Sequence, residues 1–242
     1  MREHHLSIAS TQRRACELAR SGAPPGTTVS ADSQTDGHGR LDHAWASPPG
    51  GVYFSRIEAE RSGPDPFVPL AVGVEILDVL HDRFGAPLKL KWPNDLLWMD
   101  GSRAKKLGGI LVDRVAHPPA PGLLVVGVGI NVLGDDPALP ASLRGKVAWL
   151  RQAPRPPESP AQVRELAESA VVRAVNALGS EPDRSNLLAA CRASLYGLGQ
   201  PARLDGRPAG VIRGVAPDGA LVLEQGGVGQ LARAGELEVE GP

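Results

Sequence analysis

The sequence predicts an α+β fold, with a larger domain of sheet and helices over residues 1–197 and a small β domain over residues 198–242. Three observations carry this prediction. Segments with helical spacing and segments with strand-like alternation both occur up to about residue 197. After Gly199 the chain changes to short alternating runs separated by Asp-Gly and Gly-Gly turns. A length of 242 residues suits one large domain with a small appendage.

Three helices are predicted from the spacing of apolar residues. Residues 11–20 carry their apolar side chains on one face, and a glycine and two prolines end the helix. Residues 66–84 repeat apolar side chains at helical spacing up to Gly85, which predicts a helix packed on a sheet. The third helix follows Ser159, an N-cap candidate with a proline after it, and Gln162 completes a capping box.

Strands are predicted from alternation and from runs of β-branched and aliphatic residues. They cover residues 52–55, 88–92, 106–115 and 123–132. The alternating runs after Gly199 predict a small β-barrel or sandwich of about 45 residues. A core of that size is rarely self-sufficient, so we expect this domain to lean on the larger one.

Composition excludes several classes of protein. The 26 basic and 27 acidic residues give a net charge of −1, so no overall field recruits nucleic acid or an anionic membrane surface. Two cysteines are too few for a disulfide framework. The first residues lack a signal-peptide core, and the longest apolar run, near residue 128, is too short to cross a bilayer. We expect a soluble cytoplasmic protein with no nucleic-acid or membrane partner.

Two short segments carry residues suited to binding an anionic ligand. In residues 34–40, QTDGHGR, two glycines let the backbone approach a ligand and Arg40 offers a planar fork to phosphate or carboxylate oxygens. The alternative is a flexible surface turn with a solvated arginine. In residues 91–95, KWPND, an aromatic ring, an amide and a carboxylate suit a base and a metal-bound phosphate. Alternatively, Trp92 belongs to the core and the polar residues only form the turn.

A lysine and an asparagine stand at the ends of apolar strands. Lys106 opens the strand KLGGILVD, where a lysine must reach solvent or meet an anion. Gly108 and Gly109 weaken that strand unless something approaches their backbone. Asn131 follows the run VVGVGI as either a turn former or a ligand contact. The scattered histidines give no metal-ligand signature, and neither a Walker loop nor a dinucleotide fingerprint occurs.

Taken in order, STQ, QTDGHGRLDHAWASPPGG, KWPND, KLGGILVD, GVGIN and the terminal β domain resemble the bacterial biotin protein ligases over nearly the whole chain. The resemblance implies a mixed sheet with flanking helices, similar to class II aminoacyl-tRNA synthetases, followed by an SH3-like small β-barrel. It implies that biotin and ATP form biotinyl-5′-AMP, and that a lysine of a biotin carboxyl carrier domain then takes the biotinyl group. It also implies Mg²⁺, brought with ATP near Asn94 and Asp95.

Carried over by position, the resemblance implies biotin contacts at Ser10, Thr11, Gln12, Gln34, Gly37, His38, Gly39, Arg40, Trp45, Lys106, Gly108 and Gly109. It implies ATP or adenylate contacts at Arg40, Lys91, Trp92, Asn94, Lys106 and Asn131. It implies catalytic roles for Lys106, Arg40 and Asp95. Cations there would offset the charge that develops when a carboxylate meets a polyphosphate.

Three departures from the family pattern stand out. Gln12 replaces the usual Asn, His38 replaces the usual Arg, and Asp42-His43 replaces the usual Gly-Arg. Gln12 keeps the amide's donor and acceptor one methylene further out, whereas His38 loses a permanent charge. The STQ motif begins at Ser10, so the sequence predicts the monofunctional type without an N-terminal DNA-binding domain.

Two other functions compete with this interpretation. A lipoate ligase or octanoyl transferase of the same superfamily shares the fold and an active-site lysine, but GHGR with KWPND argues against it. A non-catalytic biotin-sensing regulator fits poorly with the near-neutral charge and the missing DNA-binding domain. The sequence leaves the oligomeric state open, with a homodimer among the options.

Overall fold

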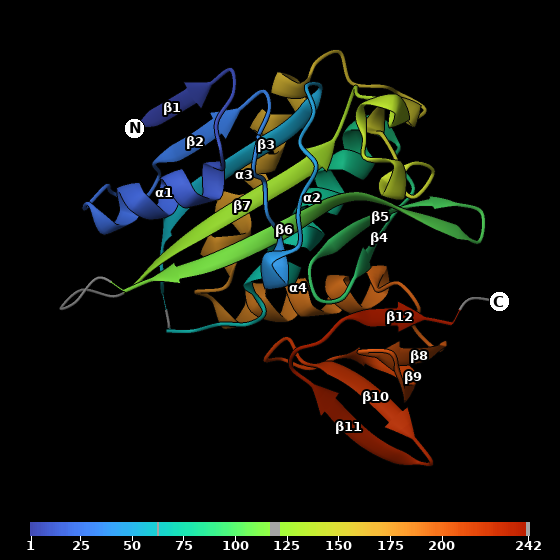
Figure 1. Cartoon of the computed structure of the whole chain (residues 1–242). Coiled ribbons are helices and arrows are strands. Elements are labelled where there is room, and N and C mark those ends of the chain that lie inside the picture. Colours follow the sequence, from blue (N-terminus) through green and yellow to red (C-terminus); the bar gives the residue numbers. More distant parts are fainter. Residues whose placement is uncertain (62, 117–121, 241–242) are drawn as a thin grey trace.

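The protein, described as a computed structural model over residues 1–61, 63–116 and 122–240, contains two sheets (Figure 1). The larger sheet has seven strands in the order β1-β2-β3-β7-β6-β5-β4. Its first two strands pair in parallel and the other neighbours pair antiparallel, so the sheet is mixed. The bounds are β1 (Arg2–His5), β2 (Thr28–Ala31), β3 (Gly51–Ala59), β4 (Leu88–Lys91), β5 (Asp95–Asp100), β6 (Arg103–Val115) and β7 (Leu123–Asn131).

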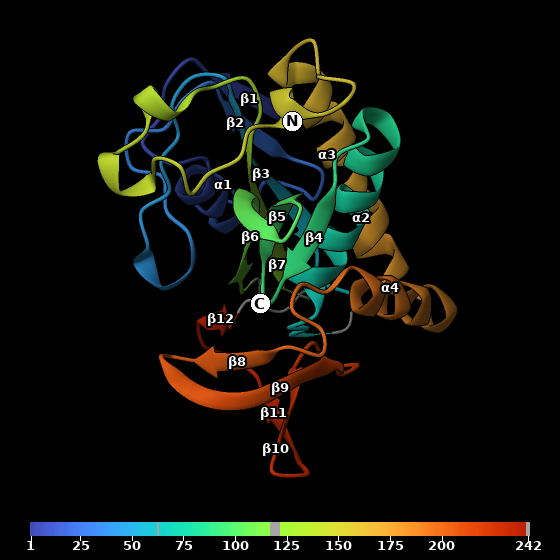
Figure 2. The same ribbon diagram turned by 90° about the vertical axis from the view of Figure 1, so that its right-hand side faces the viewer.

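Helices cover both faces of the larger sheet. On one face lies α1 (Thr11–Arg20), and on the other lie α2 (Val68–Phe84), α3 (Pro160–Ala177) and α4 (Glu181–Ser194) (Figure 2). Alternation along β7 explains the division, because Val125 packs in the cluster under α1 and Val126 packs in the cluster with α2 and α3. Short 3₁₀ turns at Arg40–Asp42, Asp136–Ala138, Ala141–Leu143 and Leu150–Gln152 lie in the connecting loops.

The predicted helix starts and ends are largely confirmed. Ser10 caps α1 by accepting the Arg13 N–H, at 3.4 Å, and Ser159 caps α3 by accepting the Gln162 N–H, at 3.3 Å. Helix α2 ends at Gly85, whose φ of 70° is left-handed. The Gln162 side chain differs from the prediction, because its oxygen accepts the N–H of Glu158 rather than that of the cap residue. No residue range predicted from the sequence corresponds to β1, β2, β5 or α4.

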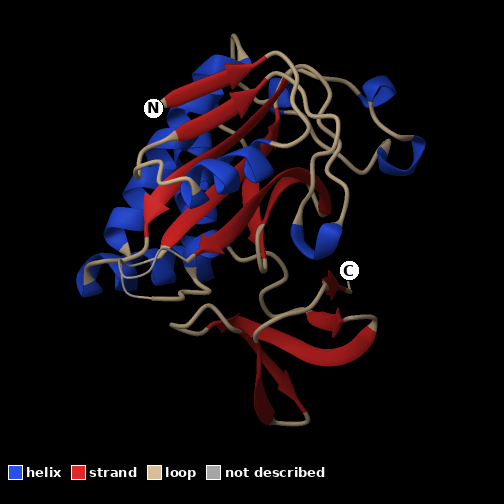
Figure 3. Cartoon of the chain, turned by 60° about the vertical axis from the view of Figure 1, so that its left-hand side comes forward, coloured by secondary structure: helices blue, strands red, loops and turns tan. Residues whose placement is uncertain are grey.

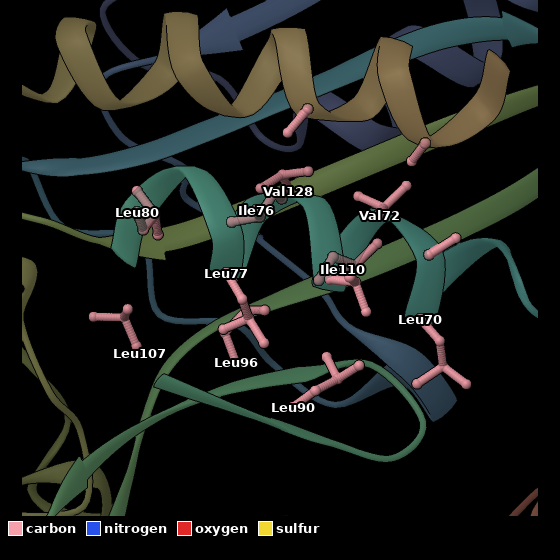
Figure 4. Packing of buried hydrophobic residues seen from close by; sticks show 14 of the residues in the cluster. Leu70, Val72, Ile76, Leu77, Leu80, Leu90, Leu96, Leu107, Ile110 and Val128 are labelled. Atoms are coloured by element: carbon pink, nitrogen blue, oxygen red, sulfur yellow. The ribbon is translucent and has the colours of Figure 1, made fainter. Parts of the chain in front are cut away.

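The main core lies between α2 and the sheet. Leu70, Ile76, Leu77 and Leu80 of α2 belong to one buried cluster with Leu90, Leu96, Ile110 and Val128 of the strands (Figure 4). Gly73 permits the close approach of helix and sheet, since a Cβ there would lie 2.6 Å from Leu90 Cδ1. This packing fixes β5, β6 and β7 from behind and leaves their opposite face available for a site.

The second sheet lies below the first and runs antiparallel in the order β11-β10-β9-β8-β12 (Figure 3). Its strands are β8 (Pro201–Leu204), β9 (Arg207–Val215), β10 (Leu221–Gln225), β11 (Val228–Ala232) and β12 (Leu237–Val239). Ile212 and Leu221 join the same buried cluster as α2, so this sheet leans on the larger domain as expected. The boundary between residues 197 and 198 stays a prediction. Within the described ranges, no helix has the length and apolarity to span a membrane.

Candidate active site

A cleft opens on the face of the larger sheet that does not pack on α2. Its floor consists of strand residues that alternation turns toward this face. Asp95 of β5 pairs with Gly109 of β6, which pairs with Gly129 of β7. In the next row, Gly127 stands between Leu111 of β6 and Ser55 of β3. The floor therefore carries glycine at its centre, with Asp95 at one edge and Ser55 at the other.

The glycines are required because other side chains lie directly on them. A Cβ on Gly129 would lie 2.8 Å from two atoms of the Trp45 indole ring. A Cβ on Gly127 would lie 2.4 Å from Gln12 Oε1. The spacing of two residues in GVGIN puts both glycines on the cleft face. Of this segment only Asn131 was predicted for the site, although the period-two spacing of the glycines is visible in the sequence.

A chain of hydrogen bonds forms the polar end of the cleft. The backbone N–H and the hydroxyl of Thr11 donate to Gln34 Oε1, at 2.8 and 3.2 Å. Gln34 Nε2 donates to Ser47 Oγ at 2.8 Å, which fixes the orientation of the amide. Because the only hydroxyl proton of Thr11 is used, the Ser55 hydroxyl donates to Thr11 Oγ1, 3.0 Å away. The protons of this chain are committed, so it offers lone pairs to a ligand.

The glycine-rich loop crosses the cleft beside this polar end. The Trp45 N–H donates to the Gly37 carbonyl at 2.8 Å, and the Gly39 N–H donates to the His43 carbonyl at 2.8 Å. His38 Nδ1 lies 3.4 Å from Ser10 Oγ, so the imidazole reaches the entrance of α1. The side chain of Asp42, one of the departures noted above, lies outside the described part of the structure.

Lys106 marks the charged end of the cleft. Its Nζ lies 2.7 Å from Asp95 Oδ1 and 5.2 Å from the centroid of a ring of Trp45. The main chain of Lys106 is held from outside the sheet, because its N–H donates to the Lys146 carbonyl at 3.1 Å and its carbonyl accepts the Ala148 N–H at 2.9 Å. This tether aims the ammonium group along the floor toward the loop.

The residues of KWPND hold the site together in different ways. Trp92 is 2% exposed, and its Nε1 donates to the Gly219 carbonyl at 3.0 Å, which ties the cleft wall to the second sheet. Asn94 Nδ2 donates to the Ile110 carbonyl at 2.8 Å. Among the described residues, no group of three or more His, Cys, Asp and Glu side chains is arranged to hold a metal ion. The oxygens of Asn94 and Asp95 remain the nearby donors of the kind that Mg²⁺ takes beside phosphates.

Most residues predicted for the site line this one cleft. They are Ser10, Thr11, Gln12, Gln34, His38, Gly39, Arg40, Trp45, Lys91, Trp92, Asn94, Asp95, Lys106 and Gly109. Three predicted residues do not line it. Gly37 packs within the loop, Gly108 faces the β7 backbone, and Asn131 donates to the Lys106 carbonyl at 3.4 Å. Their roles toward a ligand stay predictions.

Other lining residues were missed by the sequence analysis. Ser55 carried a weak signal, because it alternates with buried apolar residues in β3. Glu236 carried none, since it belongs to the second sheet's final loop and reaches the cleft only through the packing of the two parts. Behind the polar end, the Cys16 thiol lies 3.8 Å from Asp113 Oδ2. Burial, with a contribution from the Asp113 charge, raises the pKa of this thiol to about 11.

The chain belongs to the biotin/lipoate A/B protein ligase family, whose description its residues 6–131 match. It is 35% identical over 157 residues to the bifunctional ligase/repressor BirA of Bacillus subtilis, covering 62% of this chain and 46% of that protein. The chain therefore spans less than half of that relative. It is 28% identical over 246 residues to the biotin--[acetyl-CoA-carboxylase] ligase of Paracoccus denitrificans, covering 94% and 96% of the two chains.

A solved structure resembles the whole fold. The biotin protein ligase of Aquifex aeolicus, in complex with biotin and ATP, superposes with a TM-score of 0.82. The two chains share 23% identity, and the match covers 100% of this chain and 99% of the other. At this level of identity the likeness establishes the fold, which is a large mixed sheet with helices and a second, antiparallel sheet.

Proposed function

We propose that this protein is an ATP-dependent ligase that joins biotin and ATP into biotinyl-5′-AMP and then transfers the biotinyl group to a lysine of a biotin carboxyl carrier domain. One observation carries the proposal. A single glycine floor connects a buried end that offers hydrogen-bond acceptors with an end that carries Lys106, Arg40 and Asp95. Biotin has the matching polarity, with urea N–H groups at one end and a carboxylate at the other.

The polar end selects for a ligand that donates protons. Thr11 and Ser55 have committed their hydroxyl protons within the chain of hydrogen bonds, so their remaining lone pairs need donors. The cyclic urea of biotin supplies two N–H groups. The dithiolane ring of lipoate supplies none and would leave buried acceptors unpaired, which is strongly unfavourable. This argues against the lipoate and octanoyl alternatives.

The charged end suits the activation step. An oxygen of the biotin carboxylate attacks the α-phosphorus of ATP, the bond to the β-phosphate oxygen breaks, and pyrophosphate leaves. Lys106 Nζ is already held over the floor by Asp95, 2.7 Å away, and Arg40 of the glycine-rich loop lines the same cleft. Both cations offset the charge that develops between carboxylate and phosphate. Mg²⁺ near Asn94 and Asp95 would neutralise phosphate oxygens when bound.

In the transfer step the residues at the charged end of the cleft have different roles. The uncharged amine of the carrier lysine attacks the biotinyl carbonyl, and AMP leaves with the bonding electrons. When Lys106 turns from Asp95 to the phosphate, the carboxylate of Asp95 becomes available to orient the amine and accept its proton. Arg40, as a two-pronged donor, retains the adenylate between the two steps.

We further propose the finer features that the resemblance implies. The larger sheet is of the class II aminoacyl-tRNA synthetase type and the second sheet is SH3-like. The partner is the biotin carboxyl carrier domain, with no nucleic acid and no membrane involved, in the cytoplasm. A second copy of the chain could pair with β6 only beyond Ile110, because β5 pairs with β6 up to Gly109 and Asn94 holds both backbone groups of Ile110.

The test is substrate-dependent release of pyrophosphate. Purified protein with ATP and Mg²⁺ should release pyrophosphate with biotin and not with lipoate, and should raise the mass of an added carrier domain by one biotinyl group. Faster release with lipoate would replace this function by the lipoate alternative. Tight biotin binding with no pyrophosphate would indicate the non-catalytic sensor instead.

A further inference from the structure

The amide of Gln12 is locked in one orientation. Gln12 lies in the first turn of α1 and is 4% exposed. Its Nε2 donates to Asp113 Oδ2 at 2.9 Å and to the Val125 carbonyl at 2.9 Å. Both partners are oxygens that only accept, so turning the amide over would place its own oxygen against them. The two hydrogen bonds therefore decide which way Oε1 points.

The locked oxygen faces the cleft without a partner. Gln12 Oε1 is buried and makes no hydrogen bond in the described part of the chain. It lies over Gly127, where an added Cβ would stand 2.4 Å from it, and Gly127 pairs with Ser55 in the same row of the floor. A buried amide oxygen without a donor is unfavourable unless a ligand supplies one. The site is therefore built to receive an N–H at this point.

We infer that Asp113 is a positioning residue that fixes the Gln12 amide so that Oε1 accepts one urea N–H of the substrate. The inference rests on the proposed function and names a residue outside the cleft lining. Asp113 stands on β6 opposite Val125, the strand pair directly beyond the floor row of Leu111 and Gly127. From there it reaches the ligand only through Gln12.

Asp113 has a second donor that provides a matched control. The Cys16 thiol lies 3.8 Å from the same Oδ2 atom that accepts from Gln12. Removing this thiol leaves the two hydrogen bonds of the Gln12 amide in place. Removing the Asp113 carboxylate leaves one hydrogen bond, and the Gln12 amide is then free to turn about its remaining contact with the Val125 carbonyl.

The experiment compares steady-state kinetics of Asp113→Ala, Asp113→Asn and Cys16→Ala with biotin as the varied substrate. Asp113→Ala should raise KM for biotin about tenfold, with kcat within about twofold, because a contact to the ring is distant from the reacting carboxylate. Asp113→Asn retains an acceptor oxygen for Gln12 and should stay near the wild-type KM, as should Cys16→Ala. Thermal melting checks that each variant is folded, and Gln12→Met replaces Asp113→Ala if the latter is not.

A second readout separates positioning from a structural effect. Methylation of biotin on one urea nitrogen removes one N–H group. Two isomers exist, and they differ in which of the two urea nitrogens carries the methyl group. In the wild type, methylation of the nitrogen that faces Gln12 should raise KM strongly, and in Asp113→Ala or Gln12→Met that penalty should shrink at least about threefold. The other isomer should show equal penalties in all proteins. The role of Asp113 is overturned if the two methylated isomers raise KM equally in the wild type, or if Asp113→Ala has the wild-type KM for biotin. Either result leaves the proposed function standing. No pyrophosphate release from the wild type overturns both.

Discussion

The substitution Gly129→Ala tests how the floor of the cleft sets the position of Trp45. Gly129 faces the cleft from β7, and its added methyl group would lie 2.8 Å from Trp45 Cε2 and Nε1 and 2.9 Å from Cζ2. Ordinary contacts between such atoms lie at about 3.5–4.0 Å, so the ring must move away by roughly 0.7 Å or more. Trp45 belongs to a loop, which lets the ring yield more easily than a core side chain.

The expected result is a folded enzyme in which the Trp45 ring is displaced. We expect the free energy of unfolding to change by less than about 1 kcal/mol, because the loop absorbs the shift. We expect kcat/KM for biotin to fall about 10- to 100-fold, since displacements near 1 Å in a site that positions reactants have effects of this size. Biotin-dependent pyrophosphate release gives the rate, and thermal melting gives the stability.

Gly109→Ala is the matched control. Gly109 pairs with Gly129 across the strands and faces the same cleft, but its added methyl group would lie 3.5 Å from both Asp95 Oδ1 and Trp45 Cζ3. These are ordinary contacts within the protein, so Trp45 should keep its place and kcat/KM should fall much less than in Gly129→Ala. Equal losses in the two variants would refute the reasoning, because the floor itself rather than the placement of Trp45 would then govern binding.

Three further predictions follow from other contacts. Lys106→Ala should slow pyrophosphate release by about 10²- to 10³-fold with an unchanged melting temperature. Lys105 lies outside the cleft lining, so Lys105→Ala should release pyrophosphate at nearly the wild-type rate. Equal rates in the two variants would remove Lys106 from the mechanism. Arg114 binds both carboxylate oxygens of Glu60, at 2.5 and 2.7 Å, and holds the pKa of that carboxyl below its ordinary value. The stability that this ion pair adds is present above the ordinary glutamate pKa of about 4.3, and it is lost as the pH falls through the lower pKa of the folded state. The difference in melting temperature between the wild type and Glu60→Gln should therefore narrow below about pH 4. A constant difference from pH 7 to pH 3 would contradict this. Cys16, whose pKa burial raises to about 11, should resist iodoacetamide at pH 8 in the folded protein and react after unfolding, as mass spectrometry would show; rapid labelling of the folded protein would mean that the thiol is accessible and ionised.

The elements of this protein that can be predicted from the amino-acid sequence are those whose signals are local. Helix α1 and helix α3 start at Ser10 and Ser159 because a cap acts within three residues of itself. Strands β6 and β7 follow from runs of β-branched and aliphatic residues, and the position of Lys106 at the entry of such a run placed it in the site. These elements needed no knowledge of distant partners.

Which residues come together in the site depends on the tertiary fold, because the contacts that build the site join positions far apart in the chain. Gln12 contacts Asp113 about a hundred residues later, and Trp92 contacts the Gly219 carbonyl in the turn between β9 and β10. Helix α4 was missed because only Leu187 and Cys191 on it are buried, which leaves too weak a periodic pattern. Glu236 reaches the cleft only because the two parts of the chain pack together, and no spacing in the sequence encodes that packing.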